Sequence, residues 1–465
     1  GSIIINKMKR SIKITKAKFV VTMDSERRII KDGAVLIEND RIVKVGKTDA
    51  SIDWDADQTI DASEMVITPG FVNGHLHASY AHATRGIFPD GLGSEYLPNV
   101  FSLQSAMTPL EEYWTSLLAI TELLKYGTTC FLDPGSTKYL DACLSAYEQS
   151  GCRVVVGAQV VDKPNPLNLP VTSTRDASIL IRDTIETYDH ELDGRVRAWA
   201  MPFSPEFASI PLLRLAKDIA DEHDTGLTLH FNNSLRYVTD CQASTGLRPS
   251  HILRNNGILG TNVLLSHGLG LDESEVVCLA ESGSKVVVCP TAAIKSGFGM
   301  TRSGLLPEML TQGLTVCLGT DAGNNSNLVE TMRSMYLAAV LYKDSREDVD
   351  LIPPETALEM ATINGAEALG LSNEIGSIEI GKKADIVLFD TKRPEWRTMF
   401  NPINNLVYNA DGRSVHTVIV DGRVVIENYN PVYADVWEII QKVQEVGEHL
   451  LSRTGISFPS VWPII

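Results

Sequence analysis

The stretch ITPGFVNGHLH at residues 67–77 begins as an apolar run of strand length and ends in two histidines. Side chains two positions apart on an extended strand point the same way, so His75 and His77 can face one direction. The same arrangement, an apolar run that ends in a histidine or an aspartate, recurs along the chain at His230, His267 and Asp321. Reactive side chains at the carboxyl ends of successive buried strands are typical of barrel enzymes, and this pattern decides the fold prediction.

The middle of the chain predicts eight buried strands separated by helical stretches. Continuous apolar runs, unlike alternating ones, indicate parallel strands that are covered on both faces. Eight such units favour an α/β fold, a (β/α)₈ TIM-like barrel. A doubly wound open sheet is the alternative, but no glycine-rich nucleotide loop follows the first strand. The predicted strands are 66–74, 128–133, 152–161, 195–203, 226–231, 262–268, 285–289 and 314–320.

The two ends of the chain carry short alternating segments with Asp, Asn and Gly turns, which predict a different kind of sheet. We expect residues 1–65 and 371–430 to be the two halves of one small β-sandwich. The catalytic barrel, residues 66–370, would then be inserted between them. Residues 431–465 predict an amphipathic helix and an apolar tail, SFPSVWPII, that could cover the barrel or a neighbouring subunit.

Composition narrows the class of protein. The 465 residues carry a formal net charge of -17, which argues against nucleic acid as a partner. No apolar run approaches the roughly 20 residues that cross a bilayer, so we expect no membrane partner. The seven cysteines include no Cys-x-x-Cys pair, and this fits reduced thiols in a cytoplasmic protein. We expect a small-molecule substrate and a homo-oligomer, either a dimer or a tetramer.

The residue types at the strand ends point to metal chemistry. The chain has ten histidines, and four of them fall at ends of the proposed barrel strands. Imidazole and carboxylate ligands suit zinc, cobalt, iron or manganese. A divalent metal with an open coordination position lowers the pKa of bound water to about 7. An aspartate beside that water, here Asp321, can take its proton and pass it to a leaving group.

Five stretches resemble the amidohydrolase superfamily, in its cytosine-deaminase and triazine-hydrolase-like branch. They are ITPGFVNGHLH, LLSHG, VCLGTDAG, MATINGAEALGL and GSIEIGKKADIVLFD. The resemblance covers about residues 60–430. It implies that one divalent ion per subunit, cobalt or zinc by preference, is held by four residues, with His267 touching the activated water or the substrate. The implied metal ligands are His75, His77, His230 and Asp321, and the implied catalytic residues are Asp321 and His267.

Two departures bear on the reaction. MPFSPEF at the end of the fourth strand offers no lysine for a carbamylated binuclear site, so one metal ion is expected. Deaminases of this branch carry a glutamate three residues after the fifth-strand histidine, where LHFNNS places Asn233. A carboxamide cannot act as an acid or base near neutral pH. The departures resemble thiocarbamate hydrolases that act on molinate, and next the phenylurea hydrolases.

The sequence therefore predicts a metal-dependent hydrolase that cleaves a C–N or C–S bond of a thiocarbamate, urea, carbamate or amide. The alternative is an aminohydrolase of a purine, pterin or triazine-like heterocycle. A non-enzymatic scaffold is a third hypothesis, but all four implied ligands are present. Possible substrate contacts are Asn233, His82, Tyr80, Arg85 and Phe203; each has an alternative interpretation as a residue that only packs or stabilises its loop.

Overall fold

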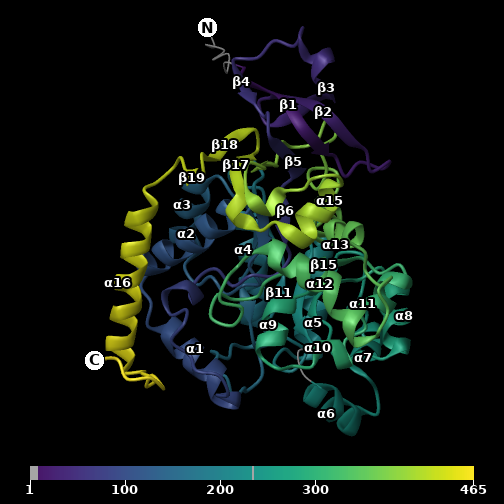
Figure 1. The fold of residues 1–465 in the computed structure, drawn as a ribbon. Helices are drawn as coiled ribbons and strands as arrows, with labels where there is room; N and C mark the ends of the chain where they lie inside the picture. Colours follow the sequence, from purple (N-terminus) through teal and green to yellow (C-terminus); the bar gives the residue numbers. More distant parts are fainter. Residues whose placement is uncertain (1–8, 233–234) are drawn as a thin grey trace, which may run out of the picture.

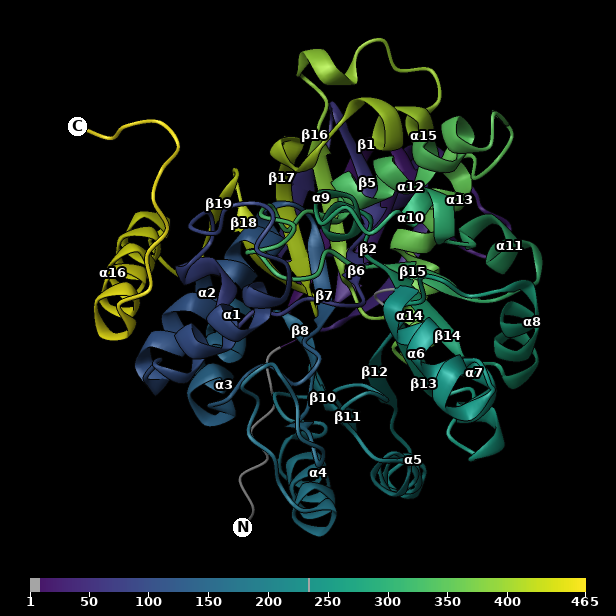
Figure 2. The ribbon, with the colours of Figure 1, turned by 90° about the horizontal axis from the view of Figure 1, so that it is seen from below.

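The computed structural model describes residues 9–232 and 235–465. Its centre is a ring of short, parallel, buried strands surrounded by helices (Figures 1 and 2). The eight strand positions are β6 (Phe71–Asn73), β7 (Thr128–Leu132), β8 (Arg153–Val156), β10 (Val196–Ala198), β12 (Leu227–Phe231), β13 (Val263–His267), β14 (Lys285–Val288) and β15 (Val316–Leu318). Two short strands continue the ring, β9 (Gln159–Val160) after β8 and β11 (Met201–Pro202) after β10.

The strands form two parallel runs, β6-β7-β8-β10 and β12-β13-β14-β15, and backbone contacts join the runs at both ends. A parallel bridge links Ala200 to Leu227 on one side. On the other side, Gly74 N donates to Leu318 O at 2.9 Å, which brings β6 against β15. The chain is therefore a (β/α)₈ barrel with an additional β domain.

Helices follow the barrel strands and cover their outer faces. Helix α2 begins with a capping box in which Thr108 and Glu111 satisfy each other's backbone N–H groups. The helices are α1 (Tyr96–Ser105), α2 (Pro109–Lys125), α3 (Leu140–Ser150), α4 (Thr174–Tyr188), α5 (Ile210–Glu222), α6 (Leu235–Thr245), α7 (Pro249–Asn255), α8 (Glu273–Ser282), α9 (Pro290–Lys295), α10 (Met300–Ser303), α11 (Leu306–Thr311), α12 (Thr331–Ser345), α13 (Pro354–Ala361), α14 (Ile363–Ala368), α15 (Pro402–Asn404) and α16 (Val436–Thr454).

Both ends of the chain contribute strands to one mixed sheet, in the order β19-β18-β17-β16-β5-β1-β2-β3 with β4 beside β1. The junction is the antiparallel pairing of β5 with β16, where Ile67 lies opposite Leu388. The strands are β1 (Ser11–Val21), β2 (Ile29–Glu38), β3 (Arg41–Lys47), β4 (Gln58–Asp61), β5 (Met65–Pro69), β16 (Ile386–Asp390), β17 (Val415–Val420), β18 (Arg423–Glu427) and β19 (Asn430–Pro431). The two terminal regions thus share a sheet; the exact domain boundaries stay a prediction.

One boundary differs from the sequence-based prediction of a single first barrel strand over 66–74. The structure divides this stretch at Gly70: β5 belongs to the additional sheet and β6 to the barrel. A Cβ at Gly70 would lie 2.0 Å from Thr129 Oγ1, so only glycine fits where the chain passes from one sheet to the other. The histidines after β6 are thus attached directly to the junction between the two sheets.

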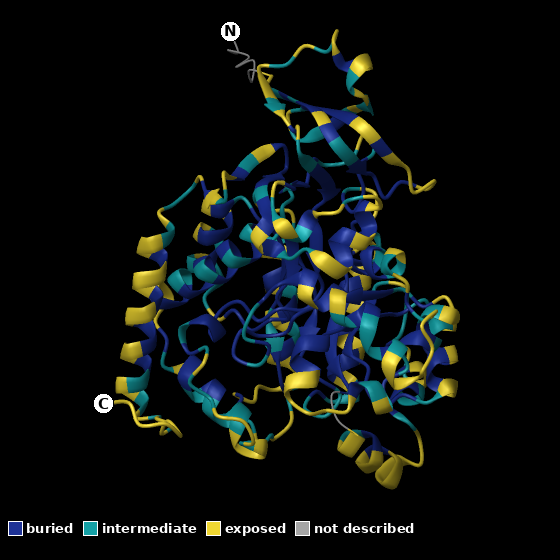
Figure 3. Cartoon of the chain, in the orientation of Figure 1, coloured by how far each residue is buried: buried dark blue, intermediate teal, exposed yellow. Residues whose placement is uncertain are grey.

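Helix α16 lies along α2 on the outside of the barrel, and its outer face is exposed (Figures 1 and 3). At Gly447 the helix approaches the backbone closely, since a Cβ there would lie 2.2 Å from Ala83 O. The apolar tail that follows is exposed, with Trp462 84% and Ile464 89% accessible. None of the described helices is long and apolar enough to cross a membrane.

Candidate metal centre

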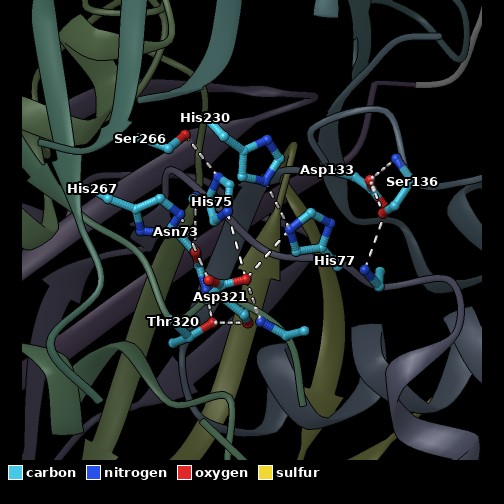
Figure 4. A network of polar contacts seen from close by, with 12 residues as sticks. Asn73, His75, His77, Asp133, Ser136, His230, Ser266, His267, Thr320 and Asp321 are labelled. Atoms are coloured by element: carbon cyan, nitrogen blue, oxygen red, sulfur yellow. Dashed lines mark hydrogen bonds and ion pairs between the residues drawn. The ribbon is translucent and has the colours of Figure 1, made fainter. Parts of the chain in front are cut away.

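Five polar side chains from four strand ends meet at the carboxyl edge of the barrel (Figure 4). Asp321 lies between the imidazoles: its Oδ1 is 3.6 Å from His75 Nε2 and 3.3 Å from His77 Nε2. Its Oδ2 is 3.8 Å from His267 Nε2. His230 Nε2 closes the group at 3.4 Å from His77 Nε2. The structure therefore brings together all five residues that the sequence singled out.

Contacts to the outer ring nitrogens orient two of the imidazoles. His230 Nδ1 lies 2.9 Å from the carbonyl oxygen of Phe203, to which it donates, so its Nε2 keeps a free lone pair. His75 Nδ1 lies 2.9 Å from the hydroxyl of Ser266. Such outer contacts fix the ring orientation of a metal-ligating histidine. The sequence analysis did not single out Ser266 as a residue of this site.

Burial and charge set the protonation states. Burial lowers the pKa of His75 to about 4, and it lowers the pKa of His77 and of His230 to about 3. These three rings are therefore neutral at neutral pH. Burial opposes ionisation of Asp321, but its histidine neighbours hold the pKa of that carboxyl well below its usual range. The site thus offers neutral nitrogen donors and one carboxylate.

This donor set fits a divalent metal ion. Two overlapping groups, His75 with His77 and His230, and His75 with His267 and Asp321, each bring their ligand atoms within 4.8 Å of one another. The buried His75 Nε2 has no hydrogen-bond partner in the described part of the chain. A buried nitrogen left unpaired costs about 1–3 kcal/mol, and coordination to a cation removes that cost. The side chains present are thus a His-His-His-Asp metal site with a further histidine beside it.

Unusual backbone conformations help to assemble the site. His267 and Asp321 have φ of 80° and 61°, in the left-handed region that side chains other than Asn, Asp and Gly rarely adopt. Strand alternation points Ser266 to the barrel interior, so a regular strand would turn the next residue outward. The positive φ at His267 departs from regular strand geometry, and the ring of His267 faces inward at this position. Strain of this kind costs about 1–3 kcal/mol and is concentrated at functional sites.

Neighbouring polar side chains hold the turns that carry His75, His77 and Asp321. Asn73 Nδ2 donates to Thr320 Oγ1 at 2.8 Å, and Asn73 Oδ1 accepts from the backbone N–H of His75 at 3.1 Å. These bonds tie the turn after β6 to the turn after β15. Asp133, which the sequence left outside the site, accepts from the backbone N–H of Ala78 at 3.3 Å and so supports the segment after His77. Asn73 and Thr320 stand in the quoted stretches ITPGFVNGHLH and VCLGTDAG, but the sequence analysis gave them no role of their own.

Aromatic rings form one wall beside the imidazoles. The Phe203 ring stacks on His230 at a centroid distance of 4.6 Å. Tyr80 lies 6.0 Å from His77, and Phe101 lies between Tyr80 and Phe203, 6.3 and 6.4 Å away. Tyr80 and Phe203, two of the expected substrate contacts, thus lie at the site. A buried wall of this kind suits a flat or apolar substrate.

The other expected contacts are placed differently. His82 Nε2 lies 2.6 Å from Glu122 Oε2, and Arg85 Nη1 donates to both oxygens of Glu122, at 2.9 and 2.6 Å. Glu122 is on α2, so both side chains pair with the outer helix layer rather than join the ring of imidazoles. Their contact with substrate stays a prediction. Asn233 lies outside the described residues.

The comparisons with known proteins agree with this geometry. The model of the amidohydrolase family matches residues 66–425, which is most of the chain. The chain belongs to the amidohydrolase family. It is 31% identical to a 5-methylthioadenosine/S-adenosylhomocysteine deaminase of Acetivibrio thermocellus over 405 residues, 87% of this chain and 91% of that protein. It is 30% identical to a 5'-deoxyadenosine deaminase of Methanosarcina acetivorans over 445 residues, 95% of this chain and 99% of that protein.

Solved structures show the same family fold. An adenosine deaminase from Xanthomonas campestris with bound zinc superposes with a TM-score of 0.86 at 26% identity, covering 95% of this chain and 99% of that one. An atrazine chlorohydrolase from Arthrobacter aurescens complexed with zinc reaches a TM-score of 0.85 at 24% identity, covering 94% of this chain and 100% of that one. The second likeness shows the fold alone. This family member is therefore a metal-dependent amidohydrolase-superfamily enzyme, and its neighbours bind zinc.

Proposed function

We propose that the protein is a metal-dependent aminohydrolase that replaces an amino group on an sp² carbon of a nitrogen heterocycle, first of all a purine nucleoside of the adenosine type. The sequence analysis gave an aminohydrolase as its alternative to a thiocarbamate, urea or amide hydrolase, and we now place that alternative first. The observation that carries the proposal is similarity over nearly the full length to deaminases of adenosine-type compounds, as in the relative from Methanosarcina acetivorans. We further propose one ion per subunit, zinc before cobalt.

The ion would be held by His75, His77, His230 and Asp321, and it would supply an activated water at neutral pH. The Asp321 carboxylate is the proton carrier: it accepts the proton of the attacking water and delivers it to the departing nitrogen. His267 is buried and its pKa is lowered, so its neutral ring donates a hydrogen bond to the substrate atom where negative charge develops.

The aromatic wall supports a flat substrate. Phe203 and Phe101 are 8% and 5% exposed, so a ring lying against them would be withdrawn from water. Stacked aromatic pairs contribute about 0.5–1.5 kcal/mol beyond the burial of their area. Together with the Tyr80 ring, these side chains would hold a heterocycle with one face toward the metal centre.

A second candidate function rests on a specific observation in the sequence. Asn233 stands where deaminases of this branch carry a glutamate, and a carboxamide cannot protonate a ring nitrogen near neutral pH. A thiolate leaves without prior protonation, and Asp321 alone can protonate a departing amine. The candidate is hydrolysis of a thiocarbamate such as molinate, or of a phenylurea, carbamate or amide.

A substrate panel distinguishes the two candidates. Protein reconstituted with zinc, and in parallel with cobalt, is assayed on 5'-deoxyadenosine, S-adenosylhomocysteine, a phenylurea and molinate, with ammonia, aniline and thiol release followed separately. Ammonia release from the nucleosides at the highest kcat/KM supports the aminohydrolase. Preferred release of thiol or aniline selects the second candidate and overturns the first. Asp321→Asn, with its metal content measured, is the matched inactive control.

A further inference from the structure

A second cavity lies on the outside of the barrel, apart from the ring of imidazoles. It is open to solvent on one side, has a volume of about 720 Å³ and is bordered by α2, α16, the turn at His82 and the loop at Asn327. Cavities that bind small organic molecules range from about 300 to 1,000 Å³. Its walls combine apolar side chains of both helices with a few charged groups, as the walls of small-molecule sites do.

The apolar part comes mainly from Leu118 on α2 and from Ile440 and Val443 on α16. Val443 is 3% exposed and forms the inner wall, whereas Ile440 is 41% exposed at the mouth. Covering the exposed part of the Ile440 side chain removes apolar surface from water, which is favourable. A ligand with an apolar body would therefore be held between the two helices.

The charged part has an excess of one positive charge. Glu122 is anionic, because His82 and Arg85 keep its pKa low against the effect of burial. His82 is neutral, since burial lowers its pKa. Arg85 is paired with Glu122, but Lys125 also lines the cavity and forms no ion pair within the described ranges. The lining of this hollow is therefore positive overall, although the chain as a whole has a net charge of -17.

The cavity wall is bonded to the loop that follows Asp321. Arg85 Nη1 donates to Asn327 O at 2.9 Å, and Val329 N donates to Glu122 Oε1 at 3.4 Å. His82 packs against Gly323, where an added Cβ would lie 2.9 Å from its ring. The same side chains thus face the cavity on one side and hold the loop beside the metal centre on the other.

We propose that this cavity binds a small organic monocarboxylate with an apolar body, roughly six to ten carbons for a cavity of this volume. The carboxylate pairs with Lys125 and with the unused N–H groups of Arg85, and the apolar body lies between Leu118 and Ile440. One excess positive charge favours a carboxylate over a doubly charged phosphate ester. Binding of the carboxylate in this cavity fixes Arg85 against the loop after Asp321 and thereby slows the loss of the metal ion.

Calorimetric titration of the zinc-reconstituted protein with octanoate tests the site, with octanamide as the neutral isostere. We expect saturable binding of one equivalent of octanoate, and octanamide should bind about tenfold more weakly because it lacks the charge. Lys125→Met should weaken octanoate binding about tenfold. Lys442→Met is the matched control, because it removes the same charge from the exposed face of α16, and it should bind octanoate as the wild type does.

The link to the metal centre is read from the rate of zinc transfer to a chelator. Saturating octanoate should slow this rate several-fold in the wild type and in Lys442→Met, but not in Lys125→Met. Absence of octanoate binding at millimolar concentration, or equal binding of octanamide, overturns the site. Octanoate binding with an unchanged rate of zinc loss overturns the coupling. Circular dichroism of each variant establishes that it is folded.

Discussion

Ser266 and His75 are 191 positions apart in the chain, and their side chains meet with Oγ 2.9 Å from Nδ1. Both residues are fully buried, so the hydroxyl has no competing water around it. The contact leaves His75 Nε2 directed toward the Asp321 carboxylate. This geometry predicts that Ser266 is a positioning residue, which acts on the metal centre through the imidazole that it contacts.

Replacing Ser266 by alanine should weaken metal binding without removing any ligand. Loss of an outer-shell partner of a ligating histidine commonly costs about 10–100-fold in metal affinity, and we expect the lower part of that range. Competition with a chelator of known zinc affinity measures the effect. Ser116→Ala is the control, since this buried serine contacts Cys143 on another face of the barrel. Equal zinc affinity in Ser266→Ala and in the wild type would show that the hydroxyl does not orient the ligand.

Glu112 should make the stability of the metal-free protein depend on pH. Its side chain is fully buried in α2 and accepts from the backbone N–H groups of Tyr139 and Lys138, at 2.6 and 3.2 Å. Burial raises its pKa to about 7 despite these bonds, whereas the unfolded chain has the ordinary value of about 4.3. The folded state therefore binds the proton more tightly. Its stabilising contribution is complete below about pH 4 and is lost as the pH rises to about 7.

We accordingly expect the thermal midpoint of the wild type to fall more between about pH 5 and pH 8 than that of Glu112→Gln. The difference corresponds to about 2–3 kcal/mol. Parallel pH dependences in the two proteins would mean that Glu112 does not take up a proton on folding in this range.

Breaking the cluster around Glu122 should destabilise the fold. Its side chain is 9% exposed and pairs with both His82 and Arg85. Glu122→Gln leaves the Arg85 guanidinium without its counter-charge. Removal of one partner of a fully buried ion pair costs about 3–5 kcal/mol, and because Arg85 is 28% exposed we expect a smaller loss, about 2 kcal/mol. The matched control is Glu186→Gln, whose 54% exposed side chain pairs with His223 on the surface and contributes at most about 1 kcal/mol. The thermal midpoints of Glu122→Gln and Glu186→Gln are compared with that of the wild type. Equal shifts in the two variants would contradict the structural role of Glu122.

The sequence predicted the parts of the fold that follow from hydrophobic pattern. The predicted strand 262–268 is β13, and the residues at its end, together with those after β6, β12 and β15, are those that meet at the metal centre. The pattern could not divide 66–74, because the break depends on the approach of Thr129 to Gly70 in three dimensions. The apolar run is continuous through β5 and β6, so the pattern does not show where one sheet ends and the other begins.

What the sequence left open concerns partners that are distant in the chain. His82 and Arg85 are possible substrate contacts because they follow the first histidine motif, and the structure pairs both with Glu122, 40 and 37 positions away on α2. Ser266 was passed over because a serine beside a histidine carries no signal of its own. Such assignments require the packing of one element against another, which the pattern within a single element does not specify.

His267 is either a ligand of the metal ion or a residue that contacts the substrate, and these two roles can be distinguished by experiment. Its Nε2 lies 3.8 Å from Asp321 Oδ2, near enough to reach the ion or to reach the substrate. We expect it to contact substrate, because His75, His77, His230 and Asp321 already provide four ligand groups. Asparagine tolerates the left-handed backbone at this position, where φ is 80°, so His267→Asn removes the imidazole without adding strain.

The prediction is that His267→Asn keeps one zinc per chain and loses turnover by about 10²–10³-fold, as expected when a group that stabilises developing charge is removed. His77→Asn is the comparison, because it removes an expected ligand and should lose the zinc itself. Metal analysis after dialysis, together with kcat on the best substrate of the panel, gives both readouts. If His267→Asn loses its zinc as readily as His77→Asn, His267 is a ligand, and the proposed division between four ligands and one substrate-facing histidine is wrong.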